Sequence, residues 1–74
     1  MNYEQGLQQL KNRIRNTGYE QEFLIYEARL RETLDREGTI GQTDQTRSDR
    51  KEVMIHLNRV AAYVHVHFEE LCRE

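Results

Sequence analysis

Several features that define common protein classes are missing from this chain of 74 residues. Proline and tryptophan are absent, glycine occurs four times and cysteine once. A single cysteine cannot form an internal disulfide, which agrees with a reducing compartment. Gln, Glu, Arg and Leu are common, and together with the lack of proline this composition favours helix. The composition therefore predicts an all-α fold without a sheet.

A strong net charge and a long apolar run are missing as well. The 11 basic and 13 acidic residues are interspersed and leave a net charge of −2. Nucleic-acid binding usually requires a positive field, so we expect no nucleic-acid partner. No apolar stretch approaches the length of about 18 residues that a membrane helix needs, and no signal peptide opens the sequence. We expect no membrane partner and a cytoplasmic location.

The length sets a further limit. At 74 residues the chain is one domain, close to the size at which a single core barely offsets the chain entropy. Association with another molecule would help such a domain. We interpret residues 1–74 as a single helical domain and expect it to be the N-terminal part of a longer protein.

Apolar residues at spacings of three and four predict a first and a third helix. The two stripes are Tyr3, Leu7, Leu10 and Ile14, and then Val53, Met54, Leu57, Val60, Ala61 and Val64. They predict helices over about 2–16 and about 44–64. Thr43 or Asp44 is the expected cap of the third helix.

The second helix is predicted from its flanking residues. Thr17 followed by Glu20 matches the spacing of a capping box and predicts a helix from about 19 to 37. The preceding turn is so short that the first two helices should be antiparallel neighbours. Gly38 and Gly41 are expected to end this helix and to open a polar loop.

The C-terminal stretch carries a mixed signal. Val64, Val66 and Phe68 alternate with two histidines as in a strand, but no second strand is predicted to pair with them. We expect a helix break at 65–67 and a short closing helix over about 67–73. The predicted fold is a small antiparallel bundle of three main helices plus a short C-terminal helix.

The second helix has more apolar surface than one neighbour can cover. Its narrow apolar face consists of Phe23, Tyr26, Leu30 and Leu34. Leu24, Ala28 and Ile25 lie progressively further round, and Ile25 is about 200° from that face. Such a helix either lies between two neighbours in its own chain or keeps one surface for another molecule. The sequence leaves both alternatives open.

Arginines on the second and third helices are the other candidate interface residues. They occur with acidic residues at ion-pair spacings, which is typical both of a solvated surface and of patches that dock copies of a protein. Cations at a helix N-terminus are disfavoured, so Arg47 and Arg50 would gain from carboxylates of a partner. The candidate interface is Leu24, Ile25, Ala28, Arg29, Arg31, Arg47 and Arg50.

Residues that could carry chemistry are few. His56, His65, His67 and Cys72 are possible metal ligands, but the first two histidines are nine residues apart and would lie on opposite faces of a helix. No His pair at i, i+4 and no C-x-x-C motif occurs. Cys72 with a nearby histidine is the only candidate nucleophile, without an evident oxyanion hole. We expect no metal, no cofactor and no enzymatic activity.

Four stretches carry a resemblance to a known family. They are EFLIYEARL, the polar GQTDQTRSDR, HLNRVA and the closing FEELC, which together cover about residues 19–72. They resemble the small effector-associated or death-like helical domains at the N-termini of bacterial conflict and antiviral proteins, often ahead of a NACHT-type NTPase, peptidase, TIR or repeat region. The resemblance implies a death-like fold and an adaptor role in which like pairs with like. The chain departs from the pattern at VHVHF, where a glycine would precede the final aromatic residue.

The residues thus predict a non-enzymatic interaction module. Its expected partner is a second copy or a matching helical domain, so a homo-oligomer is expected. The alternative is a structural helical bundle whose apolar residues are buried in an obligate symmetric dimer.

Overall fold

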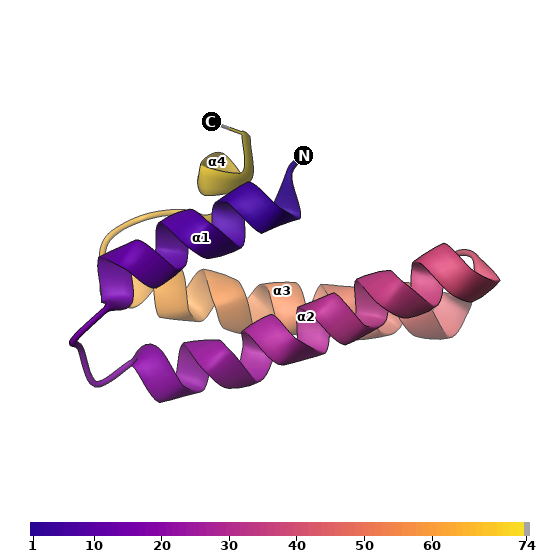
Figure 1. Cartoon of the computed structure of the whole chain (residues 1–74), viewed down its shortest axis with the longest axis horizontal. Helices are drawn as coiled ribbons and strands as arrows, with labels where there is room; N and C mark the ends of the chain where they lie inside the picture. Colours follow the sequence, from indigo (N-terminus) through magenta and orange to yellow (C-terminus); the bar gives the residue numbers. More distant parts are fainter. Residues whose placement is uncertain (74) are drawn as a thin grey trace.

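The computed structural model describes residues 1–73 and contains four helices. They are α1 (Tyr3–Ile14), α2 (Glu20–Ile40), α3 (Asp44–Tyr63) and α4 (Phe68–Arg73). No strand occurs within the described residues, so the predicted all-α fold with three main helices and a short fourth is confirmed. Helices α2 and α3 form an antiparallel hairpin, α1 lies along one face of it, and α4 packs on α1 (Figure 1).

The core takes side chains from all four helices. Its fully or almost fully buried members are Leu7, Leu10, Ile14, Phe23, Leu30, Val53, Leu57, Val60, Ala61, Phe68, Leu71 and Cys72. The predicted stripes of the first and third helices are therefore confirmed as core faces, although Tyr3, Met54 and Val64 at their margins are only partly buried. On α2, Phe23 and Leu30 are buried as predicted, whereas Tyr26 and Leu34 are only partly buried.

Helix α2 runs further than the sequence predicts. It continues through Gly38 and ends at Ile40, so the expectation that Gly38 ends the helix is wrong. A glycine costs a helix about 1 kcal/mol relative to alanine, which is too little to break it here. The second glycine does end it: Gly41 has a φ of 82°, and its N–H donates to the carbonyl of Glu37 at 2.9 Å.

The two predicted threonine caps have different outcomes. The capping box expected at Thr17 does not form, because its hydroxyl donates to the carbonyl of Ile14 at 2.5 Å and accepts from the N–H of Tyr19 at 3.2 Å. Thr43 caps α3 as predicted. Its hydroxyl accepts from the N–H of Thr46 at 3.1 Å, and the Thr46 hydroxyl accepts from the N–H of Thr43 at 2.9 Å.

The predicted break after α3 is confirmed and has the geometry of a Schellman turn. His65 has a φ of 61°, and its N–H donates to the carbonyl of Ala62 at 3.1 Å. The N–H of Val66 donates to the carbonyl of Ala61 at 3.0 Å. A histidine thus occupies the left-handed position that glycine prefers. The turn directs α4 back so that Phe68 is fully buried.

Helix α4 is held against the first turn of α1 by a close approach at Gly6. A Cβ on this glycine would collide with Sγ of Cys72 and lie 3.3 Å from its Cα. The contact is completed by two hydrogen bonds, from the N–H of Asn2 to the carbonyl of Cys72 at 2.9 Å and from Nε2 of Gln5 to the carbonyl of Leu71 at 3.5 Å. Gly6 therefore allows α1 and α4 to pack.

We expect Gly6→Ala to lower the free energy of unfolding, because overpacking costs about 1–3 kcal/mol and outweighs the gain in helix propensity. Gly6→Ala combined with Cys72→Ala should recover part of the loss. The matched control is Gly38→Ala, which places a methyl in open space and should raise the free energy of unfolding by up to about 1 kcal/mol. Urea titrations followed by circular dichroism on dilute samples measure these differences. Shifts of the same sign for Gly6→Ala and Gly38→Ala would contradict the close packing.

Candidate interaction surfaces

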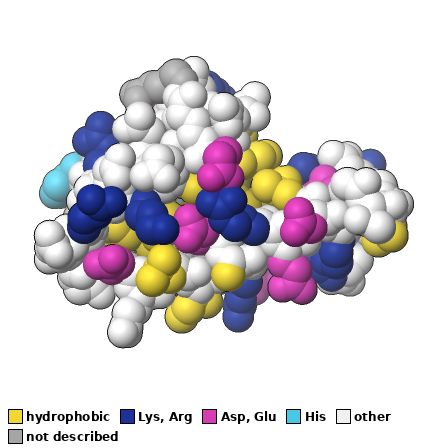
Figure 2. Space-filling model, in the orientation of Figure 1, with side chains coloured by type: hydrophobic (Ala, Val, Ile, Leu, Met, Phe, Trp, Pro, Cys, Tyr) yellow, Lys and Arg dark blue, Asp and Glu magenta, His cyan; other side chains and the backbone are white. Residues whose placement is uncertain are grey.

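The predicted apolar interface residues of α2 lie on its exposed side. Leu24 is 42% exposed and Ile25 is 55% exposed, and Ala28 beside them is also exposed. The neighbouring sides of the helix are taken: Glu27 faces α1, and Tyr26 stacks on His56 of α3. Figure 2 shows hydrophobic side chains between charged ones over α2, along the lower edge of the molecule. The sequence left open whether this surface is buried by another helix of the chain or kept for another molecule. In the structure, the described part of the chain does not bury it.

Arg29 adjoins this apolar surface and has no carboxylate partner among residues 1–73. Its guanidinium carbon lies 5.6 Å from the centre of the Tyr26 ring, a cation–π contact at an exposed site. Arg29 is itself exposed. We call Leu24, Ile25, Ala28 and Arg29 the outer patch.

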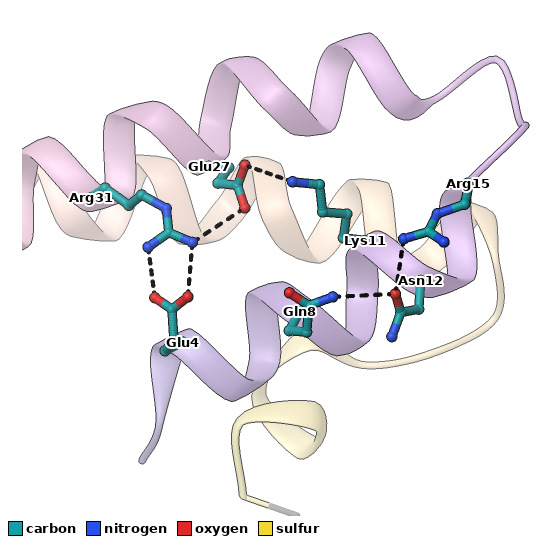
Figure 3. A network of polar contacts seen from close by, with 7 residues as sticks. All are labelled: Glu4, Gln8, Lys11, Asn12, Arg15, Glu27 and Arg31. Carbon is teal, nitrogen blue, oxygen red and sulfur yellow. Dashed lines mark hydrogen bonds and ion pairs between the residues drawn. The ribbon is translucent and has the colours of Figure 1, made fainter.

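Arg31, a predicted interface residue, instead joins α2 to α1. Its guanidinium binds both carboxylate oxygens of Glu4, at 2.6 and 3.0 Å, and approaches Glu27 at 3.5 Å (Figure 3). Glu27 also pairs with Lys11 at 3.8 Å. Hydrogen bonding by Arg31 lowers the pKa of Glu4, and the same bonds raise the pKa of Arg31. This arginine is occupied within the chain.

Arg47 and Arg50, the remaining predicted residues, lie at the start of α3. Nη1 of Arg50 donates to Oε2 of Glu37 at 3.2 Å, so a carboxylate of the same chain compensates this cation. The Glu37 side chain is only 9% exposed, and its Oε1 is buried without a donor among the described residues. Arg47 is exposed and forms no ion pair with any of the described residues.

A second group of residues lies on the side of the hairpin that faces α1, and the buried Oε1 of Glu37 is not itself at the surface. We call it the inner distal face, and its residues are Leu34, Glu37, Gly38, Arg47, Arg50 and Met54. Residues three and four apart share one side of a helix, which places Glu37 and Gly38 with Leu34. Sequence reasoning missed Glu37, because its partner is on another helix. The available signal was that Glu37 follows Leu34 by three residues, which places both on the same side of α2.

The opposite seam of the hairpin holds aromatic and charged pairs that the sequence did not reveal. The rings of Tyr26 and His56 are parallel within 3°, with centres 4.3 Å apart. Arg59 lies 3.0 Å from Glu22 and 3.0 Å from Nδ1 of His56. A guanidinium only donates, so Nδ1 is the acceptor in this contact. This histidine has a packing role between α2 and α3.

The described residues offer little for catalysis. A shallow hollow of about 200 Å³ between α2 and α3 has a charged rim over Thr33 and Val53. Cys72 is buried, and burial raises the pKa of its thiol, which disfavours the reactive thiolate. Within residues 1–73, no group of three or more His, Cys, Asp or Glu residues is placed to hold a metal ion.

Two isoleucines outside the predicted interface are also exposed: Ile40 at 64% and Ile55 at 60%.

Over the described part of the chain, no helix is both long enough and apolar enough to cross a membrane. Comparisons with models of protein families, with curated proteins and with solved structures found no match. The function must therefore be inferred from the residues of this chain.

The Glu4–Arg31 pair predicts a pH effect. Because the folded state lowers the pKa of Glu4, the pair stabilises the fold above the pKa that Glu4 has when unfolded, and this contribution is lost as the pH falls through the lower, folded pKa. From about pH 5 down to about pH 2, the free energy of unfolding should decline more steeply in the native chain than in Glu4→Gln. Urea titrations across this range measure the two slopes, and equal slopes would contradict the pairing.

Proposed function

We propose that this chain is a non-enzymatic protein-interaction module, which associates with copies of itself or with a matching helical domain. The observation that carries the proposal is the outer patch. Leu24 and Ile25 are adjacent and about half exposed, and Ala28 and Arg29 continue the same side of α2. Contiguous apolar surface on a small domain is typical of an interaction site, whereas scattered apolar residues are not.

The size of the patch indicates the strength of binding. Complete burial of a leucine or isoleucine side chain contributes about 1.5–3 kcal/mol, and each of these two is already partly covered. Part of the gain is offset by the freedom that two molecules lose on association. A single contact is therefore modest in affinity. Tethering several copies raises their effective concentration and makes assembly strong.

The resemblance to effector-associated domains extends the proposal. On that basis the association recruits or clusters an effector in bacterial defence signalling, in the cytoplasm. This part of the proposal is supported by the pattern of residues alone. The alternative function is a structural bundle in a closed symmetric dimer, whose mass would not change with concentration above its dissociation constant.

The proposal predicts that Ile25→Glu reduces self-association without loss of helicity. A charge at this position would have to be desolvated in the contact, which opposes association. The matched control is Ile55→Glu, the same substitution at a similarly exposed isoleucine on α3, which should assemble like the native chain. Sedimentation velocity over a concentration series measures the mass, and circular dichroism measures helicity. A native chain that stays monomeric at about 1 mM would overturn the proposal.

A further inference from the structure

The four helices form two pairs, which are joined by two short connections. Helices α1 and α4 pack on each other and form the layer, and α2 and α3 form the hairpin. Residues 15–19 connect α1 to α2, and residues 64–67 connect α3 to α4. Tyr19 and Tyr63, beside the two connections, stack with ring centres 4.3 Å apart. Both connections therefore lie at the same end of the hairpin, opposite its own turn (Figure 1).

Each pair is held together by contacts of its own. In the layer, Cys72 approaches the backbone at Gly6 and accepts at its carbonyl from the N–H of Asn2 at 2.9 Å. In the hairpin, Arg59 pairs with Glu22 at 3.0 Å. Each pair can thus keep its internal contacts whichever copy of the chain supplies the other pair.

The contact between the layer and the hairpin is the apolar core, with an ion pair at its edge. The layer contributes buried Leu7, Leu10, Ile14, Phe68 and Leu71, and the hairpin contributes buried Phe23, Leu30, Leu57, Val60 and Ala61. At the edge, Arg31 of α2 binds both carboxylate oxygens of Glu4 of α1, at 2.6 and 3.0 Å. A second copy presents the same layer with the same groups, so its layer fits this hairpin equally well.

Both connections contain a residue with a side chain in the left-handed region. Asn16 has a φ of 66° and His65 has a φ of 61°. In this region a Cβ is crowded by the following carbonyl, which raises the free energy of every residue except glycine. The turn inside the hairpin differs, because its left-handed position is occupied by Gly41. Extending the two connections would relieve this crowding, whereas opening the hairpin turn would not.

The connections are also long enough to pass from one copy to another. When extended, residues 15–19 span up to about 17 Å and residues 64–67 up to about 14 Å. Both lengths exceed the distance of about 10 Å between the axes of packed helices. Opening the first turn breaks the hydrogen bond from the N–H of Thr17 to the carbonyl of Ile14, and water can replace it.

We propose that two copies of this chain exchange their layers, so that the layer of each copy packs on the hairpin of the other. The exchange re-forms every contact between layer and hairpin and replaces two turns by extended connections. The product is a closed two-fold dimer, because both layers and both hairpins are then occupied. This inference goes beyond the proposed function, since the outer patch lies outside the exchanged contact.

The exchange differs in rate from association through the outer patch. The core must open before two layers can change places, so folded copies exchange slowly. Copies that fold together at high concentration exchange while they fold. The dimer, once formed, should persist on dilution for the same reason. A concentration series on chains that were never unfolded therefore reports on the outer patch alone.

Refolding at two concentrations tests the exchange, with Ile25→Glu as the parent variant because its outer patch is blocked. Refolding from urea at about 1 mM should give a dimer in sedimentation velocity, and refolding at about 1 µM should give a monomer. A variant that is monomeric after refolding at the higher concentration, or a dimer that dissociates at once on dilution, would overturn the inference. The proposed function is tested separately, on the native chain without unfolding.

Two charge variants identify the exchanged contact. In the Ile25→Glu parent, Glu4→Arg places two cations together within one copy, and Arg31→Glu places carboxylates together within another. In the exchanged mixed dimer, one layer–hairpin contact has the native ion pair and the other has the reversed pair. After joint refolding at low salt, native mass spectrometry should show the mixed dimer several-fold above its random share. A random distribution of the three dimers would contradict the exchange.

Substitutions at His65 test the role of the connections. His65→Gly relieves the left-handed turn of the monomer and should weaken the dimer about tenfold or more, whereas His65→Val should strengthen it. The matched control is His67→Gly, the same substitution in the same connection at a residue without a positive φ, which should leave the dimer unchanged. Dimer fractions after refolding over a concentration series measure these shifts. Equal shifts for the two glycine variants would count against the exchange.

Discussion

The arrangement of this protein depends on a mismatch in length between α1 and the α2–α3 hairpin. Twelve residues of α1 cover the first part of two helices of 21 and 20 residues. Where α1 is present, Phe23, Leu30 and Leu57 are fully buried. Beyond its start the same side of the hairpin holds Leu34 and Met54, which are only partly covered. The core is therefore complete at one end of the hairpin and open at the other.

Helix α4 does not correct this mismatch, because it packs on α1. Gly6 lets Cys72 approach the α1 backbone so closely that the two short helices form one layer over the first part of the hairpin. The Schellman turn at His65 directs the chain toward that layer. The polar contacts among α1, α2 and α3 orient the layer more than they stabilise it, since exposed ion pairs contribute about 0–1 kcal/mol.

The sides of α2 have distinct roles. One side enters the core, a second binds α1 through Glu27 and Arg31, and a third stacks on α3 through Tyr26. The remaining side carries Leu24 and Ile25 and meets solvent. This side therefore carries apolar surface that no other helix of the described chain covers.

Much of the fold could be predicted from the sequence because it depends on local spacing. The stripes of α1 and α3 and the cap at Thr43 involve residues within a few turns of one another. The end of α2 was missed because the cost of Gly38 is small beside the energy of packing the helix. Thr17 was misjudged because its hydroxyl has a competing acceptor, the carbonyl of Ile14.

The interface was harder to predict because the arginines depend on partners that are distant in the sequence. Arg31 pairs with Glu4 across 27 residues, and Arg50 pairs with Glu37 across 13. No periodicity within one helix contains that information. Periodicity did place Leu24 and Ile25 away from Phe23, because their angle from Phe23 is a property of α2 alone, but it left open whether another helix of the chain covers them.

Isoleucine methyl spectra recorded during dilution from about 1 mM to about 10 µM test most directly whether α2 has more apolar surface than its own chain covers. The methyl resonance of Ile25 should move with concentration, while those of buried Ile14 and exposed Ile55 stay in place. Spectra that do not change with concentration, or changes at Ile55 but not at Ile25, would contradict this account.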